Sequence, residues 1–470
     1  MKPVYIVSWL FALAISFVSC DDWLDKTPKD RLYPDVYFKT EDELRLFTNQ
    51  FYNNLVPSAV DIYSESSDLI VKSDLMLEMS GQRIIPDEGN GWNFTALRDI
   101  NFYLQYSHNC TEVNARNRYD GVARFFRAYF YFEKVKRYGD IPWYDKALDS
   151  DDPELYKARD SREFVMQKML EDLDFAIANL PKTKNAYVLT RWTALALKSR
   201  VCLFEGTFRK YHGLEDCEKY LNACVSASET FMNESGYTLY KSGSTPYRDL
   251  FASINLQADE VIFGRDYEAS LSVLHNVQNY ENSTTMGRPG MNKKIVNSYL
   301  MADGSRFTDK AGYETMTFDQ ECQNRDPRLA QTIRTPGYTR IGSTKKEAPN
   351  LAYTMTGYHL IKYSMTANYD EYNKSCNDIP LFRTAEVYLN FAEAKAELGT
   401  LKQADINKSI KLLRDRVGMT NLDMELANSK PDPYLMSAAT GYPNVKGANQ
   451  GVILETVSYT HLTLPTKLEV

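Results

Sequence analysis

The sequence predicts a mainly α-helical fold, in which helix hairpins stack into a scaffold that carries long irregular loop insertions and a few short strands. Three stretches share one pattern: each opens with arginine, continues with apolar residues at helical spacing and reaches a glycine 15 or 16 residues later. The first two begin 67 residues apart, close to twice the period of about 34 residues of tetratricopeptide repeats. A hairpin cannot bury its apolar face alone, so the prediction is a tetratricopeptide-like scaffold of stacked hairpins.

The three stretches are the expected first helices of the hairpins. They read RFFRAYFYFEKVKRYGD from Arg124, RWTALALKSRVCLFEGT from Arg191 and RTAEVYLNFAEAKAELGT from Arg383. Their glycines are predicted helix stops: Gly139, Gly206 and Gly399. An amphipathic second helix is expected after each, at 162–181, 215–232 and 404–419. The helical repeats would then occupy about 41–232 and 380–419.

Between these regions, residues 233–380 have another character. ENSTTMGRPGMNKK at 281–294 and IRTPGYTRIGSTKKEAPN at 333–350 are rich in turn residues and are typical of loops. The short alternating runs DEVIFGRDY and YHLIKYS predict small strands. A long irregular insert is uncommon unless it carries function. We therefore expect rigid helices on one side and function-bearing loops on the other.

The N-terminus is typical of an exported and lipid-anchored chain. After Met1 and Lys2, the segment from Val4 to Val18 is almost wholly apolar but shorter than the roughly 20 residues that span a membrane. It predicts a signal peptide over residues 1–19, with Cys20 as the lipid attachment site in LAISFVSCDDWLDKTP. The alternative is an ordinary secretory signal that is cut nearby, with Cys20 incidental.

Composition describes a globular, core-forming chain of 470 residues with 43% hydrophobic and 25% charged residues. The net charge of −7 argues against nucleic-acid binding, which needs a basic surface. The cysteines beyond Cys20 form no CxxC pair and no metal-like spacing with the five histidines, so we expect no metal and no other cofactor. Cys217 and Cys224 would lie on one helix face, as small buried side chains rather than as a disulfide.

No catalytic motif is present. GxSxG, HExxH, a phosphate-binding P-loop and a dinucleotide-binding GxGxxG are all missing from the sequence. Two carboxylates can serve a glycosidase as acid and base, but 62 acidic residues make accidental pairs certain. DEGNGW at 87–92 lacks the alternating oxygen ligands and the distal glutamate of a calcium loop.

Trp92 is the leading candidate for ligand contact. It lies in the loop EGNGWNF, where an indole can stack on the C–H face of a sugar while Asn90 and Asn93 bind its hydroxyls. The alternative is that Trp92 packs back onto the scaffold, as large aromatic residues usually do. Weaker candidates lie in or beside the 281–294 loop: Tyr280, Asn282 and Arg288. Trp143 is expected to be structural, and Trp192 to lie in the helical core.

Six pieces, in this order, resemble the SusD/RagB-type outer-membrane lipoproteins of Bacteroidetes. They are SCDDWLDKTP, FYNNLV, FFRAYFYFEKVKRYGDIPWYD, RWTALALKSRVCLFEGTF, YLMADGSRF followed by NRDPRL, and IPLFRTAEVYLNFAEAKAELG. The likeness covers residues 20–455, and Asp21 and Asp22 resemble the acidic tag that sends such lipoproteins to the cell surface. The resemblance implies a tetratricopeptide-like scaffold and a non-catalytic, glycan-binding role. It also implies a partner, a SusC-like TonB-dependent transporter, for which the protein acts as a lid.

The C-terminus departs from that pattern. After GVILE at 451–455 the family continues into a basic, aromatic helix, whereas this chain reads TVSYTHLTLPTKLEV. The segment has no helical apolar period and contains Pro465. We therefore expect residues 456–470 to be a non-native tail after truncation.

The leading hypothesis is thus a surface lipoprotein of the outer membrane that binds oligosaccharide or polysaccharide for nutrient uptake. The first alternative is uptake of peptides, as in RagB-like members, which would make the helical scaffold an adaptor for peptide or protein. The second is a helical glycoside hydrolase, which would release product where a pure binding protein never does.

Overall fold

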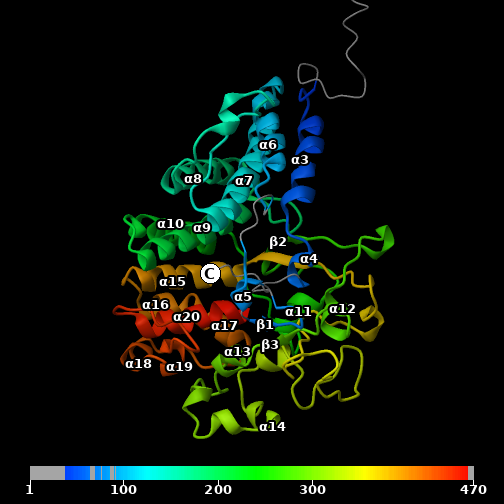
Figure 1. Cartoon of the computed structure of the whole chain (residues 1–470), viewed down its shortest axis with the longest axis vertical. Helices are drawn as coiled ribbons and strands as arrows, with labels where there is room; N and C mark the ends of the chain where they lie inside the picture. The colour runs from blue at the N-terminus through cyan, green and yellow to red at the C-terminus, as the bar shows by residue number, and fades with distance from the viewer. Residues whose placement is uncertain (1–36, 64–68, 76, 85–88, 90, 464–470) are drawn as a thin grey trace, which may run out of the picture.

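The computed structural model describes residues 37–63, 69–75, 77–84, 89 and 91–463. The main helices are α3 (Glu41–Leu55), α6 (Thr95–Tyr106), α7 (Val113–Tyr138), α8 (Arg162–Asn179), α9 (Arg191–His212), α10 (Cys217–Glu234), α15 (Thr384–Glu397), α17 (Ile410–Arg416) and α20 (Gln450–Thr463). They stack along the long axis of the molecule: α3, α6, α7 and α8 at one end, then α9 and α10, then α15, α17 and α20 (Figure 1). The insert 233–380 lies beside and below the lower part of this stack (Figure 1). The predicted fold class, a mainly helical stack with irregular insertions, is confirmed.

The first two hairpins form in the predicted regions, but α7 begins at Val113, before the expected start at Arg124. Helix α7 packs against α8, and α9 packs against α10. Helix α7 ends at Gly139, whose φ of +70° lies in the region that favours glycine. Ser161 begins α8, because its hydroxyl accepts a hydrogen bond from the backbone N–H of Phe164 at 3.3 Å. The predicted stop at Gly139 is therefore confirmed.

The predicted stop at Gly206 is wrong. Helix α9 continues through it and ends at Gly213, which has a φ of +67°. A Cβ atom on Gly206 would lie 2.7 Å from the Cγ and Cδ2 atoms of Leu221 on α10. This glycine allows α9 and α10 to approach closely, and a sequence pattern does not separate that role from a helix end.

The third hairpin is partly as expected. Helix α15 ends before Gly399, which has a φ of +72°. The predicted partner helix at 404–419 divides into α16 (Gln403–Asn407) and α17. The division lies at Ser409, whose backbone leaves the helical region at φ −134° and ψ −89° and whose hydroxyl donates to the carbonyl of Asp405 at 2.6 Å. The prediction of one continuous helix is therefore wrong.

Helix α20 lies against α15 and continues into the segment that was expected to be a tail. Val452 and Leu454 are buried, and Glu455 forms an ion pair of 2.9 Å with Arg414 on α17. Residues 456–463 are helical although their sequence has no helical apolar period. Residues 464–470 lie outside the described part of the chain, and the non-native origin of the tail stays a prediction.

The strands are short and tie distant segments together. Strand β2 (Val261–Arg265) pairs antiparallel with β4 (Ile379–Arg383), so the start of the insert meets its end. Strand β1 (Ile70–Val71) pairs antiparallel with β3 (Gly290–Met291). The strand predicted in DEVIFGRDY is confirmed as β2. YHLIKYS at 358–364 makes only isolated bridges, through His359 and Leu360. The remaining short helices are α4 (Ala59–Tyr63), α5 (Leu77–Ser80), α11 (Pro246–Ala252), α12 (Val277–Asn282), α13 (Lys293–Ser298), α14 (Phe318–Glu321), α18 (Met424–Ser429) and α19 (Pro433–Met436).

A buried ion cluster fastens the insert to the helical stack. Glu260, directly before β2, accepts from Arg383 at the end of β4 and from Arg416 of α17, both at 2.8 Å. All three side chains are at most 1% exposed. Because a buried charge is tolerated only when it is paired, this cluster fixes the position of the insert relative to α15 and α17.

The described cysteines are all free, and Cys224 is buried on α10 beside Ser199 and Ser228. Within the described residues, no helix has both the length and the apolar character that a membrane span requires.

Candidate functional site

Trp92 is the exposed member of the three described tryptophans. Its side chain is 40% exposed, whereas Trp143 and Trp192 are 6% and 4% exposed. The core position predicted for Trp192 is therefore confirmed, and Trp143, which was expected to be structural, is buried too. The Trp192 indole N–H donates to the carbonyl of Lys182 at 2.6 Å. An indole that remains at the surface of a chain with a large core is a candidate contact for a ligand.

The loop that carries Trp92 is fastened to the last turns of α7. The carbonyl of Gly91 accepts hydrogen bonds from the Lys134 ammonium and, at 2.9 Å, from the backbone N–H of Asn93. Gly91 has a φ of +80°, and a Cβ atom there would lie 3.2 Å from the Tyr138 hydroxyl. Burial, reinforced by the nearby Arg137, lowers the pKa of the Lys134 ammonium. Gly91 is thus held against α7 by backbone and side-chain contacts.

Among the described residues, three side chains make ring or cation contacts with the indole. Tyr138 and Phe94 meet it edge to face, with ring centroids 4.9 Å and 5.3 Å away. The Arg159 guanidinium lies 5.0 Å from the ring centroid and also donates to the carbonyl of Tyr138 at 3.5 Å. An aromatic ring that is already held in place loses little entropy when a ligand binds. Trp92 therefore forms a fixed platform with a cationic hydrogen-bond donor beside it.

Asn93 belongs to the same loop, and its side-chain oxygen is already used in a hydrogen bond within the protein. Its side-chain oxygen accepts from the backbone N–H of Thr95 at 2.8 Å and so supports the start of α6. The residue is exposed beside Trp92. Its predicted partner Asn90, like the predicted lipidation site Cys20, lies outside the described residues.

Tyr280 and Asn282, two of the weaker candidates for ligand contact, are buried rather than exposed. Tyr280 and Asn282 on α12 are only 2% and 5% exposed. The amide nitrogen of Asn282 donates to Ser364, while its oxygen accepts from the guanidinium groups of Arg334 and Arg340 at 2.7 Å and 3.1 Å. The expectation of a sugar-facing surface at Tyr280 and Asn282 is corrected, because the insert folds onto itself and encloses α12.

Arg288 is half-buried and holds two parts of the insert together. Its guanidinium donates to the carbonyl oxygens of Leu351 and Ala352 at 2.7 Å and 2.9 Å, and its carbonyl accepts from the N–H of Met355. The φ of +53° at this residue fits a tight turn. Arg288 therefore has a structural role in this loop, and its contact with a ligand stays a prediction.

The carboxyl groups with the most strongly raised pKa values do not form a surface pair. Burial raises the pKa of Glu281 to about 7 and that of Glu393 to about 8. Glu281 is 2% exposed and accepts from the backbone N–H of Tyr363 and the hydroxyl of Ser364 at 2.8 Å. Glu393 lies on α15 and is half-buried. The described residues contain no group of three or more histidine, cysteine or acidic side chains that would hold a metal ion.

Sequence reasoning missed Tyr138, Arg159 and Lys134, which complete the surroundings of Trp92. The motif RYGDIPWYD contains Tyr138, but nothing in its pattern indicates a contact with a loop more than 40 residues earlier. Arg159 lies between α7 and α8 in a stretch without periodicity. These residues become neighbours only through the packing of the first hairpin.

Two family profiles match the chain. Residues 250–457 match the profile described as SusD family. Residues 82–191, which include Trp92 and its neighbours, match a profile described as starch-binding associating with outer membrane.

Individual relatives agree with these profiles. SusD-like protein P2 of Formosa agariphila is 25% identical over 445 residues, which cover 88% of this chain and 82% of the relative. Among solved structures, a SusD-like protein from Bacteroides fragilis has a TM-score of 0.67 at 20% identity and covers 93% of this chain and 88% of its own. A SusD-like carbohydrate binding protein from the same organism has a TM-score of 0.69 at 18% identity, with coverages of 90% and 84%. On its two family profiles and its relatives, the chain is a SusD/RagB-type protein.

Proposed function

We propose that this protein is a non-catalytic lipoprotein of the cell surface that captures an oligosaccharide or polysaccharide and delivers it to a SusC-like TonB-dependent transporter in the outer membrane. The observation that carries the proposal is the exposed, fixed indole of Trp92, 40% exposed and supported by Tyr138, Phe94 and Arg159. That the chain is a SusD/RagB-type protein supports the same role.

At this site the exposed surface of Trp92 would stack against the C–H face of a sugar ring, which is apolar, while groups beside it bind the hydroxyls. Arg159 supplies guanidinium donors, and Asn93 supplies a side-chain amide. Such contacts are few, so a single sugar unit would bind weakly. A polymer that offers many units compensates by avidity.

The anchor would be Cys20, which carries lipid after removal of residues 1–19. A single acyl chain gives only marginal binding to a membrane, whereas two or more hold a protein stably. Replacement Cys20→Ala is therefore expected to move the protein from the membrane fraction to the soluble fraction, as measured by immunoblotting of fractionated cells. Retention of the Cys20→Ala variant in the membrane would contradict this anchor.

Affinity electrophoresis tests the binding role. The full-length protein in detergent is run through gels that contain one polysaccharide each, and every gel is also assayed for released sugar. We expect one polysaccharide to slow the wild-type protein without release, and Trp92→Ala to migrate as it does in an empty gel. Tyr372→Ala is a matched control, because Tyr372 is also an exposed aromatic residue and lies in the insert.

Other outcomes point to the alternative functions. Sugar release by the wild-type protein would overturn the non-catalytic role. Lack of retardation by every polysaccharide, together with binding of oligopeptides, would replace glycan by peptide as the captured nutrient.

A further inference from the structure

Three cationic side chains gather around the exposed indole of Trp92. The guanidinium carbon of Arg159 lies 5.0 Å from its ring centroid. The Lys134 ammonium donates to the carbonyl of Gly91, the residue before Trp92. Arg137 lies beside the same residue, since a Cβ atom on Gly91 would be 3.6 Å from Nη1 of Arg137. The chain as a whole has a net charge of −7, so this group of cations is opposite in sign to the overall charge.

Arg159 has no carboxylate partner among the described residues. The residue is exposed. Within the described part of the chain, its guanidinium makes one hydrogen bond, to the carbonyl of Tyr138 at 3.5 Å, and no ion pair. A guanidinium carries five N–H donors. Most donors of Arg159 are therefore available to a ligand that stacks on the ring beside them.

The carboxylates next to these cations in the sequence already have other partners. Glu133 pairs with Lys136 at 2.9 Å. Asp160 pairs with a lysine three residues earlier at 3.0 Å. Asp140 accepts a hydrogen bond at 2.8 Å from the backbone N–H of the first residue of α8. None of the three forms an ion pair with Arg159, although Asp160 follows it directly in the chain.

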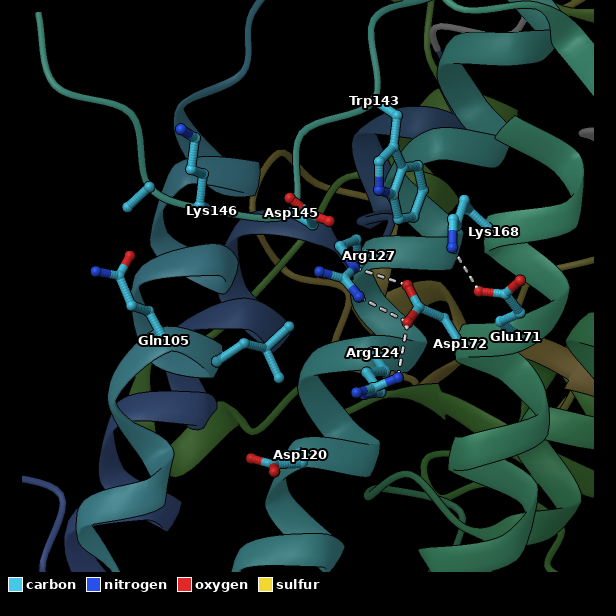
Figure 2. A pocket seen from close by; sticks show the side chains of 12 residues that line it. Gln105, Asp120, Arg124, Arg127, Trp143, Asp145, Lys146, Lys168, Glu171 and Asp172 are labelled. Atoms are coloured by element: carbon cyan, nitrogen blue, oxygen red, sulfur yellow. Dashed lines mark hydrogen bonds and ion pairs between the residues drawn. The ribbon is translucent and has the colours of Figure 1, made fainter. Parts of the chain in front are cut away.

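The cavity between α6, α7 and α8 shows a contrasting arrangement (Figure 2). There Arg124 and Arg127 converge on the carboxylate of Asp172, with N···O distances of 3.5 Å and 2.7 Å. Arg127 and Asp172 are both buried, and their charges compensate each other inside the protein. At the Trp92 platform, the described residues offer Arg159 no such carboxylate.

The pKa of Lys134 responds to the neighbouring cation. Burial, together with the charge of Arg137, lowers the pKa of its ammonium, so its charged form is disfavoured. An anion bound beside the ring would favour the charged form again, because a nearby opposite charge stabilises it. The electrostatics of the platform are therefore suited to a negatively charged ligand.

Two properties of that ligand follow from these groups. A carboxylate or a sulfate ester presents at least two oxygens to the planar fork of a guanidinium, whereas a sugar hydroxyl presents one. The exposed indole favours an apolar surface, such as the C–H face of a sugar ring. A sugar with an acidic substituent meets both conditions. The net charge of −7 opposes it little, because interactions beyond roughly 8 Å are largely screened at physiological ionic strength.

We propose that the Trp92 platform binds an acidic glycan, with a sugar ring on the indole and a carboxylate or sulfate ester of the glycan on Arg159. The inference rests on the proposed role of Trp92 in glycan capture and names the class of glycan that is captured. Trp92 makes the contact that neutral and acidic sugars share. Arg159 determines the preference between them.

Matched pairs of polysaccharides test this preference. The full-length protein in detergent is run through gels that contain polygalacturonate, κ-carrageenan, or the neutral methyl-esterified and desulfated forms of the same two polymers. We expect one acidic polymer to bind with a dissociation constant about tenfold lower than that of its neutral form. Retention by either acidic polymer above its neutral form supports the proposal and identifies the anion as a carboxylate or a sulfate ester.

Variants of Arg159 assign the preference to its guanidinium, by calorimetric titration with oligosaccharides after circular dichroism shows equal folding. Arg159→Gln removes the charge and keeps an N–H donor, so it should weaken acidic binding about tenfold and neutral binding less than about threefold. Arg159→Lys keeps the charge but loses the fork and should lie between Arg159→Gln and wild type. Lys345→Gln removes an exposed cation of the insert and is the matched control, which should bind as wild type does.

Three results would overturn the acidic preference and leave glycan capture in place. They are retention by neutral polysaccharides alone, an equal loss of acidic and neutral binding in Arg159→Gln, and unchanged acidic binding in that variant. Trp92→Ala separates these results from a failure of the proposed function, because it should abolish retention of acidic and neutral polymers alike. If no polysaccharide of either kind slows the wild-type protein, glycan capture fails and the preference fails with it.

Discussion

The buried cluster around Glu260 allows a quantitative test of how the insert is fastened to the stack. Glu260→Gln keeps the shape of the side chain but removes the charge that compensates Arg383 and Arg416, each 2.8 Å away and at most 1% exposed. Removing one partner from a buried ion cluster leaves uncompensated charge and costs about 3–5 kcal/mol. Native proteins are stable by only about 5–15 kcal/mol, so the loss would be a large part of the total.

The control for this change is Asp415→Asn on the same helix as Arg416. Asp415 pairs with Lys411 at 2.5 Å, but the two side chains are 38% and 41% exposed, and such surface pairs contribute about 0–1 kcal/mol. The assay is urea unfolding followed by circular dichroism and tryptophan fluorescence. Glu260→Gln should lower the unfolding midpoint far more than Asp415→Asn. Equal midpoints for the two variants would refute the reasoning that this cluster holds the insert.

Two further predictions concern stability. Burial lowers the pKa of His275 to about 4 and that of His359 to about 3, from an ordinary 6.5. The unfolded chain therefore takes up protons that the folded chain does not, and these groups make the free energy of unfolding fall as the pH drops from 6.5 towards 4. The urea midpoint of the wild type should therefore fall more steeply over this range than that of His275→Gln, and parallel curves would contradict the prediction. Gly206→Ala places Cβ 2.7 Å from Leu221 and should destabilise by about 1–3 kcal/mol. Gly121→Ala, whose Cβ has no contact below 3.4 Å, should stabilise by up to about 1 kcal/mol; thermal unfolding that ranks the two in the opposite order would exclude the steric argument.

The stack of helices was predictable because its signals are local. Apolar spacing of 3.6 residues and a glycine after the last turn locate the end of α7 and both ends of α15 within a few residues. The errors occur where tertiary contacts decide. Gly206 looks like a helix end but serves the approach of α9 to α10, and Ser409 divides a segment whose apolar pattern is continuous.

Of the candidate site, only Trp92 could be singled out from the sequence, and its contact with a ligand stays a prediction. Trp92 stands out in the sequence because a large aromatic side chain in a Gly/Asn loop has no helix of its own in which to be buried. Tyr280 and Asn282 look similar in sequence, yet the insert folds over them and uses Asn282 as a partner for two arginines. Tyr138 and Arg159 surround Trp92 through the packing of the first hairpin, which no local pattern records.

The most direct test of the central claim is calorimetric titration with oligosaccharides of whichever polysaccharide the wild-type protein retains. Wild type, Trp92→Phe, Trp92→Ala and the control Tyr372→Ala are compared after circular dichroism shows equal folding. The account predicts that Trp92→Ala weakens binding about tenfold or more, that Trp92→Phe lies between it and wild type, and that Tyr372→Ala binds as wild type does. Unchanged affinity in Trp92→Ala would contradict capture of the glycan at this platform.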